Sequence, residues 1–153
     1  MILDSRRTYT DLGLLVIRVG IGLGMFYFQG LPKLMGGAAG LETVGSAMGH
    51  LGITFGYYYW GLLAAIAEGL GGLLLAAGLI FRPAAAAMAF VMLMAFIEQL
   101  SRPMPVPVHP FNNFWVFVGL FIAGPGRHSL DRLLFGNKDH AGLEHSSPAP
   151  SVR

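Results

Sequence analysis

The sequence predicts an all-α membrane protein built as a bundle of four transmembrane helices. Two observations lead to this fold class: an unusually apolar composition and four long apolar segments. Of the 153 residues, 54% are hydrophobic and only 12% are charged, whereas an average soluble domain carries about 25% charged residues. So few polar residues cannot cover a globular surface in water, whereas helices satisfy their own backbone groups in lipid.

The four apolar segments define the predicted membrane spans. They are residues 12–31, 60–81, 84–100 and 111–124. A helix needs about 20 apolar residues to cross the hydrocarbon, so the fourth segment is short. It spans only if Pro110, Asn112 and Asn113 lie at one interface. Residues 81–83 leave room only for a tight turn between the second and third spans, with Pro83 in the first helical turn, where its missing N–H costs little.

The lysines and arginines predict the orientation of the bundle. With four spans, both termini and the 81–83 turn share one side, which carries most of these residues: Arg6, Arg7, Arg82, Arg127, Arg132, Lys138 and Arg153. The other side carries Lys33 and Arg102. The positive-inside rule therefore predicts that both termini are cytoplasmic. A signal peptide is the alternative, but the first apolar run is longer than an h-region of about 7–15 residues and contains Arg18.

The connections between the spans carry patterns of their own. After the first span, four apolar residues are spaced three and four apart: Leu41, Val44, Met48 and Leu51. This spacing predicts a short amphipathic helix that lies at the membrane surface between the first and second spans. The stretch "SRPMPVPVHP" after the third span contains four prolines and is predicted to be extended rather than helical.

The chain is expected to form one membrane domain, residues 1–136, followed by a polar tail. Residues 137–153 are polar and rich in proline and serine, a composition that predicts disorder. Just before the tail, "SLDRLLF" predicts a short amphipathic helix on the inner membrane surface. Ser129 is its expected N-cap, and Asp131 lies in its first turn.

Polar side chains within the spans are predicted to gather at one level of the bilayer. At about 1.5 Å of rise per residue, Gln29, Glu68 and Glu98 lie roughly 20–25 Å from the cytoplasmic ends of their helices. Arg18 lies roughly 9 Å from that side, and Lys33 follows the first span on the outer side. These positions predict a polar pocket that opens outward. Its expected rim consists of Arg102, His109 and Asn112.

Two interpretations of these buried charges remain open at the level of sequence. An ionisable residue inside a span costs at least about 2.5–3.5 kcal/mol, so it indicates either a structural or a functional role. In the first interpretation, Arg18 and Glu68 form a buried ion pair that fixes the register of the helices. In the second, the pocket residues bind a small molecule or relay protons: Glu68, Arg18, Glu98, Gln29 and Lys33.

Several functional classes find no support in the sequence. Cysteine is absent, so disulfides, thiolate chemistry and Cys-ligated metals are excluded on this chain. The positive residues are scattered rather than clustered, so no nucleic-acid binding is predicted. His50 and His109 match no metal-ligand spacing, and we predict no metal site. Phosphate-binding, dinucleotide-binding and nucleophile-elbow motifs are also absent.

Three segments give the chain a resemblance to the DoxX family of membrane proteins. They are "RVGIGLGMFYFQGLPKL" in the first span, "AEGLGGLLLAAGLIFRPAA" across the second and third, and "GPGRHSLD" after the fourth. The residues at the motif positions are Arg18, Gly30, Lys33, Glu68, Gly71, Gly72, Gly78 and Arg82. The resemblance implies a small four-helix protein of the bacterial inner membrane. Many relatives carry histidine where this chain has Gln29, which can only hydrogen-bond.

The resemblance also implies redox work linked to quinones. The leading hypothesis is therefore a redox-associated subunit, at most a subunit of a quinone-linked oxidoreductase, that binds a quinone-like or small amphipathic molecule in the outer pocket. Quinone is the cofactor this implies, and a redox partner subunit would supply electrons. The alternatives are a transport or permeation element, self-associated through Gly-rich faces such as Gly20 and Gly24, and an assembly protein with a structural Arg18–Glu68 pair.

Overall fold

The computed structural model describes residues 2–103 and 108–135, and within these ranges the chain is helical without strands. The elements are α1 (Ile2–Met25), η1 (Phe26–Gly30), α2 (Leu31–Met35), α3 (Gly37–Gly45), η2 (Ser46–Leu51), α4 (Tyr57–Ala77), α5 (Phe81–Leu100), α6 (Val108–Ala123) and α7 (Leu130–Phe135). The all-α prediction is confirmed for these ranges. The predicted disordered tail, residues 137–153, lies outside the described residues.

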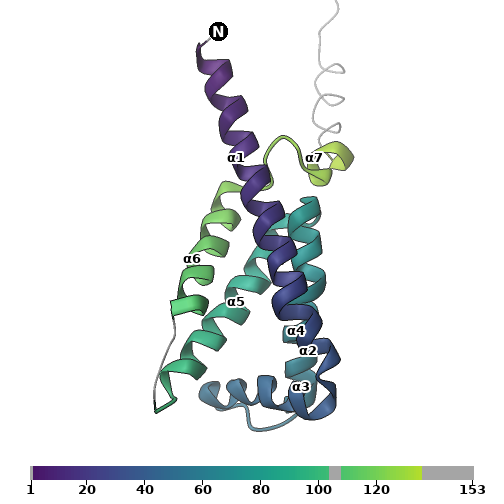
Figure 1. The fold of residues 1–153 in the computed structure, drawn as a ribbon, viewed down its shortest axis with the longest axis vertical. Coiled ribbons are helices and arrows are strands. Elements are labelled where there is room, and N and C mark those ends of the chain that lie inside the picture. Colours follow the sequence, from purple (N-terminus) through teal and green to yellow (C-terminus); the bar gives the residue numbers. More distant parts are fainter. Residues whose placement is uncertain (1, 104–107, 136–153) are drawn as a thin grey trace, which may run out of the picture.

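Three of the helical segments are long and apolar enough to cross a membrane. They are Tyr9–Met35, Tyr57–Ala77 and Phe81–Leu100, which correspond to the first three predicted spans. The fourth predicted span corresponds to α6, a shorter apolar helix of 16 residues with a length of about 24 Å. The start of α1 and helix α7 lie at the same end of the bundle (Figure 1), as the predicted topology requires. The cytoplasmic placement of that end stays a prediction.

The first span does not end at Leu31, just before Pro32, as the sequence predicted. It continues as α2 to Met35 because the chain forms a π-helical turn, η1, just before the proline. Proline has no N–H and its ring clashes with the carbonyl four residues earlier. The wider turn avoids this conflict, since the N–H of Leu31 donates to the carbonyl of Phe26, five residues back. Such single π turns occur often at functional sites.

The turn between the second and third spans lies slightly earlier than predicted. Helix α4 ends at Ala77 and is capped by Gly78, which has a φ of 70°. Helix α5 begins at Phe81 with Pro83 in its first turn, as expected. Ile80 also has a positive φ, 48°, which is unfavourable for a β-branched residue. The carboxylate of Asp131 offsets this conformation by accepting the N–H groups of Ile80 at 2.8 Å and Phe81 at 2.9 Å.

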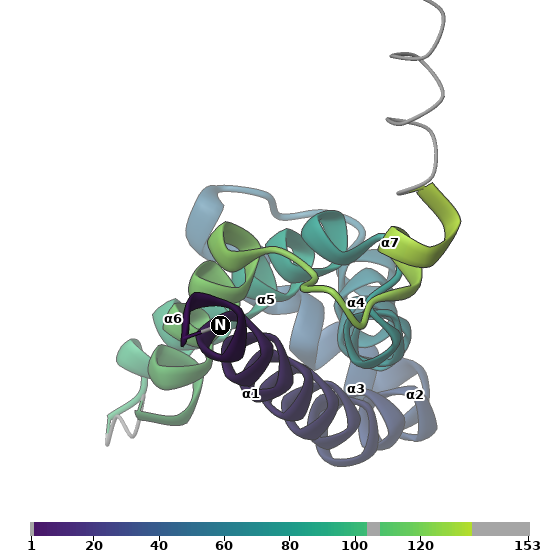
Figure 2. The same cartoon turned by 90° about the horizontal axis from the view of Figure 1, so that it is seen from above.

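The segment Gly37–Leu51, formed by α3 and η2, confirms the predicted short helix between the first two spans. We call it the interfacial segment. It crosses the end of the bundle opposite α7 and runs from α4 toward the end of α5 (Figures 1 and 2). Leu41 and Met48 are buried against the bundle, whereas Leu51 is exposed. The predicted apolar face therefore packs on protein, except for its last residue, Leu51, which is exposed.

The proline-rich stretch 101–110 is only partly as predicted. Residues 104–107 lie outside the described ranges, but α6 begins at Val108, so His109 and Pro110 are helical rather than extended. Pro110 lies in the first helical turn, where the missing N–H has no intrahelical partner to lose. The prediction of an extended strap is wrong for these last three residues, because prolines are compatible with a helix start.

Glycines allow the helices of the bundle to approach closely. A Cβ added at Gly22 on α1 would lie 2.5 Å from the Gly72 carbonyl oxygen on α4, and one at Gly30 would lie 2.4 Å from the Cα of Gly69. Small residues drive helix association in membranes in this way. The predicted pair Gly20 and Gly24 is not used within the bundle, since no atom lies within 4 Å of a Cβ built at either.

We expect Gly61→Ala to lower the melting temperature of the detergent-solubilised protein and Gly20→Ala to leave it unchanged or raise it. A Cβ at position 61 would lie 1.8 Å from the carbonyl oxygen of Leu41, so α3 would have to move, and overpacking costs about 1–3 kcal/mol. At Gly20 the added methyl meets open space, and alanine favours a helix by about 0.5–1 kcal/mol. Equal melting temperatures for the two variants would contradict the α3–α4 packing.

Candidate ligand cavity

A cavity of about 790 Å³ lies between the interfacial segment, α4 and α5. We call it the central cavity. Most of its lining is apolar, and the polar residues that line it include five that the sequence predicted for the pocket or its rim: Gln29, Lys33, Glu98, Arg102 and His109. These five residues come from η1, α2, the end of α5 and the turn after it, and the start of α6. We call them the polar set. The structure thus brings together residues separated by up to 80 positions in the chain.

Gln29 reaches the cavity because it belongs to the π turn. The widened turn of η1 precedes Pro32, and Gly30 next to it packs directly on the backbone of Gly69. This contact brings the first span against α4 at the depth of the cavity. Gln29 also lines a second, smaller cavity of about 160 Å³ together with His109 and Asn113. An amide at this position can both donate and accept hydrogen bonds.

Lys33 and Glu68 form the buried ion pair of the bundle. Lys33 Nζ donates to Glu68 Oε2. The Glu68 side chain has no exposed surface, whereas the Lys33 side chain retains 23% of its exposure and lines the cavity. Glu68 itself is not among the lining residues. Its second oxygen, Oε1, is buried and has no hydrogen-bond partner among the described residues. Lys33 therefore stands between the buried carboxylate and the cavity.

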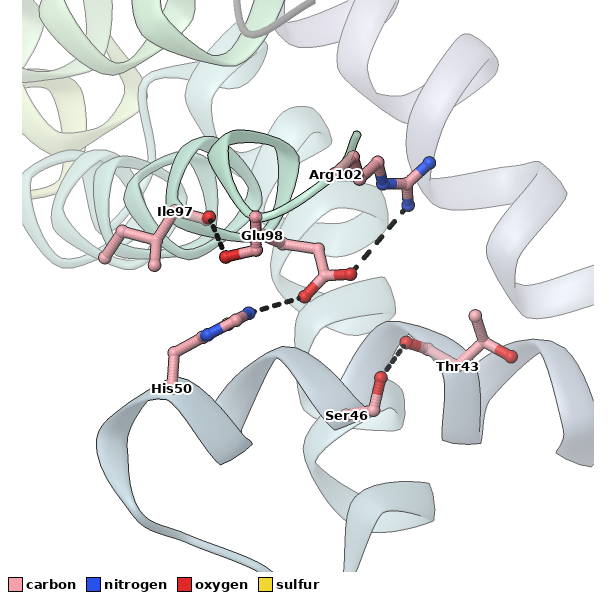
Figure 3. A network of polar contacts seen from close by, with 7 residues as sticks. Thr43, Ser46, His50, Ile97, Glu98 and Arg102 are labelled. Atoms are coloured by element: carbon pink, nitrogen blue, oxygen red, sulfur yellow. Dashed lines mark hydrogen bonds and ion pairs between the residues drawn. The ribbon is translucent and has the colours of Figure 1, made fainter. Parts of the chain in front are cut away.

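Glu98 is held by partners different from those of Glu68. Its Oε2 lies 2.8 Å from His50 Nε2 on η2, and its Oε1 lies 4.0 Å from Arg102 one turn further along the chain. Figure 3 shows Glu98 between these two residues, above the interfacial segment. The contact with His50 ties the interfacial segment to the end of α5. About one third of the Glu98 side chain remains exposed.

The predicted pairing of Arg18 with Glu68 is wrong. The guanidinium of Arg18 donates instead to the backbone carbonyls of Pro125 and His128, in the loop between α6 and α7. The side chain is 1% exposed, and it lies against Gly78, where a Cβ would come within 2.5 Å of Nη1. Arg18 thus occupies the end of the bundle near α7. Lys33 occupies the place beside Glu68 that the sequence assigned to Arg18.

Asn112 is exposed and does not line the central cavity, although the sequence placed it on the pocket rim. Its neighbour Asn113 faces inward, with Nδ2 3.4 Å from Nε2 of His109 one turn before it. A helix turns by about 100° per residue. An error of one position in the predicted rotation of α6 therefore turns Asn112 inward in place of Asn113.

Two residues with clear structural roles were missed at the level of sequence. His50 was considered only as a metal ligand, whereas its partner is Glu98. Asp131 lies in the first turn of α7, as predicted, but the sequence did not show that its carboxylate caps α5 at Ile80 and Phe81. The predicted N-cap is confirmed, since Ser129 Oγ accepts the N–H of Arg132 at 3.3 Å. Among the side chains that the structure describes, those of residues 9–103 and 108–134, no three from histidine or acidic residues converge as metal ligands.

The helices and the cavity define a multi-pass membrane protein with a partly polar pocket at one end of its bundle. The profile of the DoxX family matches residues 13–99, more than half of the chain, and the chain belongs to this family. The matched region contains most of the polar set together with Arg18 and Glu68. No curated protein and no solved structure matches the chain.

Proposed function

We propose that this protein binds a quinone-like or other small amphipathic molecule in the central cavity, as the membrane subunit of a redox complex of the bacterial inner membrane. The observation that supports this proposal is the division of the cavity into an apolar part and the polar set. Ligand sites typically measure about 300–1,000 Å³, with apolar walls and a few convergent polar groups. The central cavity, at about 790 Å³, fits this description.

The polar set can recognise a head group that carries carbonyl or hydroxyl oxygens. An ammonium has three donors, and Lys33 gives one to Glu68, which leaves donors for a carbonyl oxygen in the cavity. Gln29 can donate to a second oxygen. Glu98 is an acceptor and suits the hydroxyl of a reduced head group. A site with donors and acceptors of this kind accommodates both redox forms of a quinone.

A quinone bound in the cavity would supply the redox chemistry, since its reduction to a quinol takes up two electrons and two protons. The chain has no cysteine, so we assign the source of electrons to a redox partner subunit. Lys33 Nζ and the Glu98 carboxylate are the groups of this chain that would hold protons at the head group. The buried Glu68 accepts a hydrogen bond from the Lys33 ammonium and so orients it toward the cavity.

We expect Gln29→Leu to weaken binding of a benzoquinone by about tenfold, the effect of one lost hydrogen bond in a closed site. Asn112→Leu is the matched control, because it removes the same amide group at a position outside the cavity. Binding to the purified protein in nanodiscs would be titrated for both variants. Mass spectrometry of the native extract would show whether quinone is co-purified.

Three outcomes distinguish this proposal from its alternatives. Equal affinities for the two variants would contradict head-group binding at the polar set. Flux of a solute or of protons through proteoliposomes, without bound quinone, would instead support a transport element. Absence of both, together with loss of a partner protein from the membrane extract of a deletion strain, would support an assembly role.

A further inference from the structure

The central cavity extends well beyond the polar set into a purely apolar region, which we call the trough. Its walls come from α4 and α5: Leu63, Ile66, Ala67, Ala87, Phe90 and Val91. Ala87 and Glu98 lie eleven positions apart on α5, which corresponds to about 16 Å along the helix. One wall of the same cavity therefore changes from charged to apolar over half the thickness of a bilayer.

The trough is open on the side between α4 and α5. Leu63, Ile66 and Phe90 line it, yet they are 57%, 40% and 47% exposed. The two helices touch near their common turn, where a Cβ at Gly71 would lie 3.5 Å from Met88. They diverge toward the interfacial segment (Figure 1). Both helices are candidate membrane spans, so the opening faces the hydrocarbon of the bilayer rather than water.

The other end of the cavity is covered by the interfacial segment. A Cβ at Gly45 would lie 1.8 Å from the carbonyl oxygen of Tyr57, so α3 is in direct backbone contact with α4. Ala47 and Met48 are buried against Met94 on α5. The contact between His50 and Glu98 closes the segment on that helix. A ligand therefore meets packed protein from the aqueous side and an open trough from the lipid side.

The charges of the polar set indicate an uncharged head group. Lys33 is paired with Glu68, and Arg102 lies beside Glu98, so the formal charges of these four residues cancel in pairs. A phosphate head group would introduce a negative charge without a free cation to bind it. A neutral oxygen-bearing head with one hydrocarbon tail matches the polar set and the trough together.

We propose that the trough binds the hydrocarbon tail of the ligand, which enters the central cavity sideways from the bilayer between α4 and α5. This inference rests on the proposed function and narrows the ligand to a membrane-dissolved molecule with a neutral head and a single tail. The tail moves from lipid to apolar protein, so little hydrophobic free energy is gained. The trough acts chiefly by directing the head toward Lys33 and Gln29.

Filling the trough tests this inference. Ala87→Phe places a large side chain in the trough, whereas Ala86→Phe adds the same group at the exposed neighbouring position outside it. Two probes would be titrated in nanodiscs: a decyl-tailed benzoquinone and the same benzoquinone without a tail. We expect Ala87→Phe to weaken binding of the tailed probe by about tenfold or more and that of the tail-less probe by less than about twofold. Ala86→Phe should change neither.

A second variant, on α4, controls for the possibility that Ala87→Phe acts by distorting α5 locally. Ala67→Leu narrows the trough from the α4 wall and is expected to have the same selective effect on the tailed probe. Equal weakening of both probes, or unchanged binding of the tailed probe, would overturn the trough inference and leave head-group binding intact. Failure of both probes to bind the unmodified protein would overturn the proposed function and this inference with it. A photoreactive phospholipid that labels Phe90 and resists displacement by the tailed probe would assign the trough to lipid instead.

Discussion

Arg18→Met is expected to cause the largest loss of stability of any single substitution proposed for this protein. The guanidinium donates to two carbonyls of the loop between α6 and α7, those of Pro125 and His128. Hydrogen bonds from a charged group contribute about 1.5–3 kcal/mol each, so losing both lowers the free energy of unfolding by about 3–6 kcal/mol. The methionine fills part of the space but offers neither carbonyl a donor.

The loss should be local to the end of the bundle that carries α7. Arg18 on α1 lies toward the opposite end of the bundle from Gln29 and does not line the central cavity. We therefore expect the folded fraction of the variant to bind a benzoquinone normally. Thermal melting in detergent and hydrogen exchange in the 124–129 loop would measure the effect. Arg132→Met, an exposed arginine of α7, is the matched control. A stable Arg18→Met protein that has lost quinone binding would contradict this assignment.

This placement gives the "GPGRHSLD" segment a structural role. Asp11 on α1 accepts the N–H of Arg127 at 3.2 Å, two helical turns before Arg18. The N–H of Asp131 in turn donates to the Gly78 carbonyl at 2.9 Å, and its carboxylate caps α5. The loop after α6 therefore joins the first span to the turn between α4 and α5. A glycine is required at position 78 because its φ is 70° and Arg18 occupies the adjoining space.

The sequence was sufficient to predict three of the spans and the level at which several of the polar groups meet. Apolar length defines a membrane helix almost alone, which is why three of the predicted spans correspond to candidate spans in the structure. Depth follows from helical rise, and Gln29, Lys33 and Glu98 do line one cavity. Both of these predictions depend on positions along a helix axis, which the sequence determines directly.

The pairing of the charges could not be predicted in the same way. Spacing gives the face of a residue on its own helix, but not how two helices are rotated against each other. The π turn at η1 adds a further shift in register before Lys33, because one extra residue rotates everything after it by about 100°. Pro32 was the available signal, and it was interpreted as a helix end rather than as the cause of a π turn.

Contacts between a connecting segment and a distant span could not be predicted from the sequence either. Asp131 and Ile80 are separated by 51 positions, and His50 and Glu98 by 48. Each pair joins a connecting segment to the end of a span, and no periodicity links such segments. From the sequence, Asp131 was expected only in the first turn of a short helix, and His50 was considered only as a metal ligand. In the structure, Asp131 is a helix cap, and His50 ties the interfacial segment to α5.

Lys33→Met is expected to destabilise the bundle by about 3 kcal/mol. Removing one partner of a buried ion pair leaves the other charge uncompensated, at a cost of about 3–5 kcal/mol. Lys33 keeps 23% of its exposure, so water already screens the pair in part and the lower end of this range applies. The variant leaves Glu68 without a donor for either oxygen, since Oε1 has no partner among the described residues. The melting temperature in detergent would measure the loss.

The double variant Lys33→Met, Glu68→Leu separates stability from function at this site. Replacing both members of a buried ion pair by apolar residues is often neutral or stabilising, so we expect the melting temperature to return to that of the unmodified protein. If Lys33 orients the head group, we expect this stable double variant to bind quinone poorly, because the ammonium that lines the cavity with Gln29 is gone. Recovery of binding together with stability would show that the pair only holds α2 against α4. In that case, the rest of the polar set would have to recognise the ligand without Lys33.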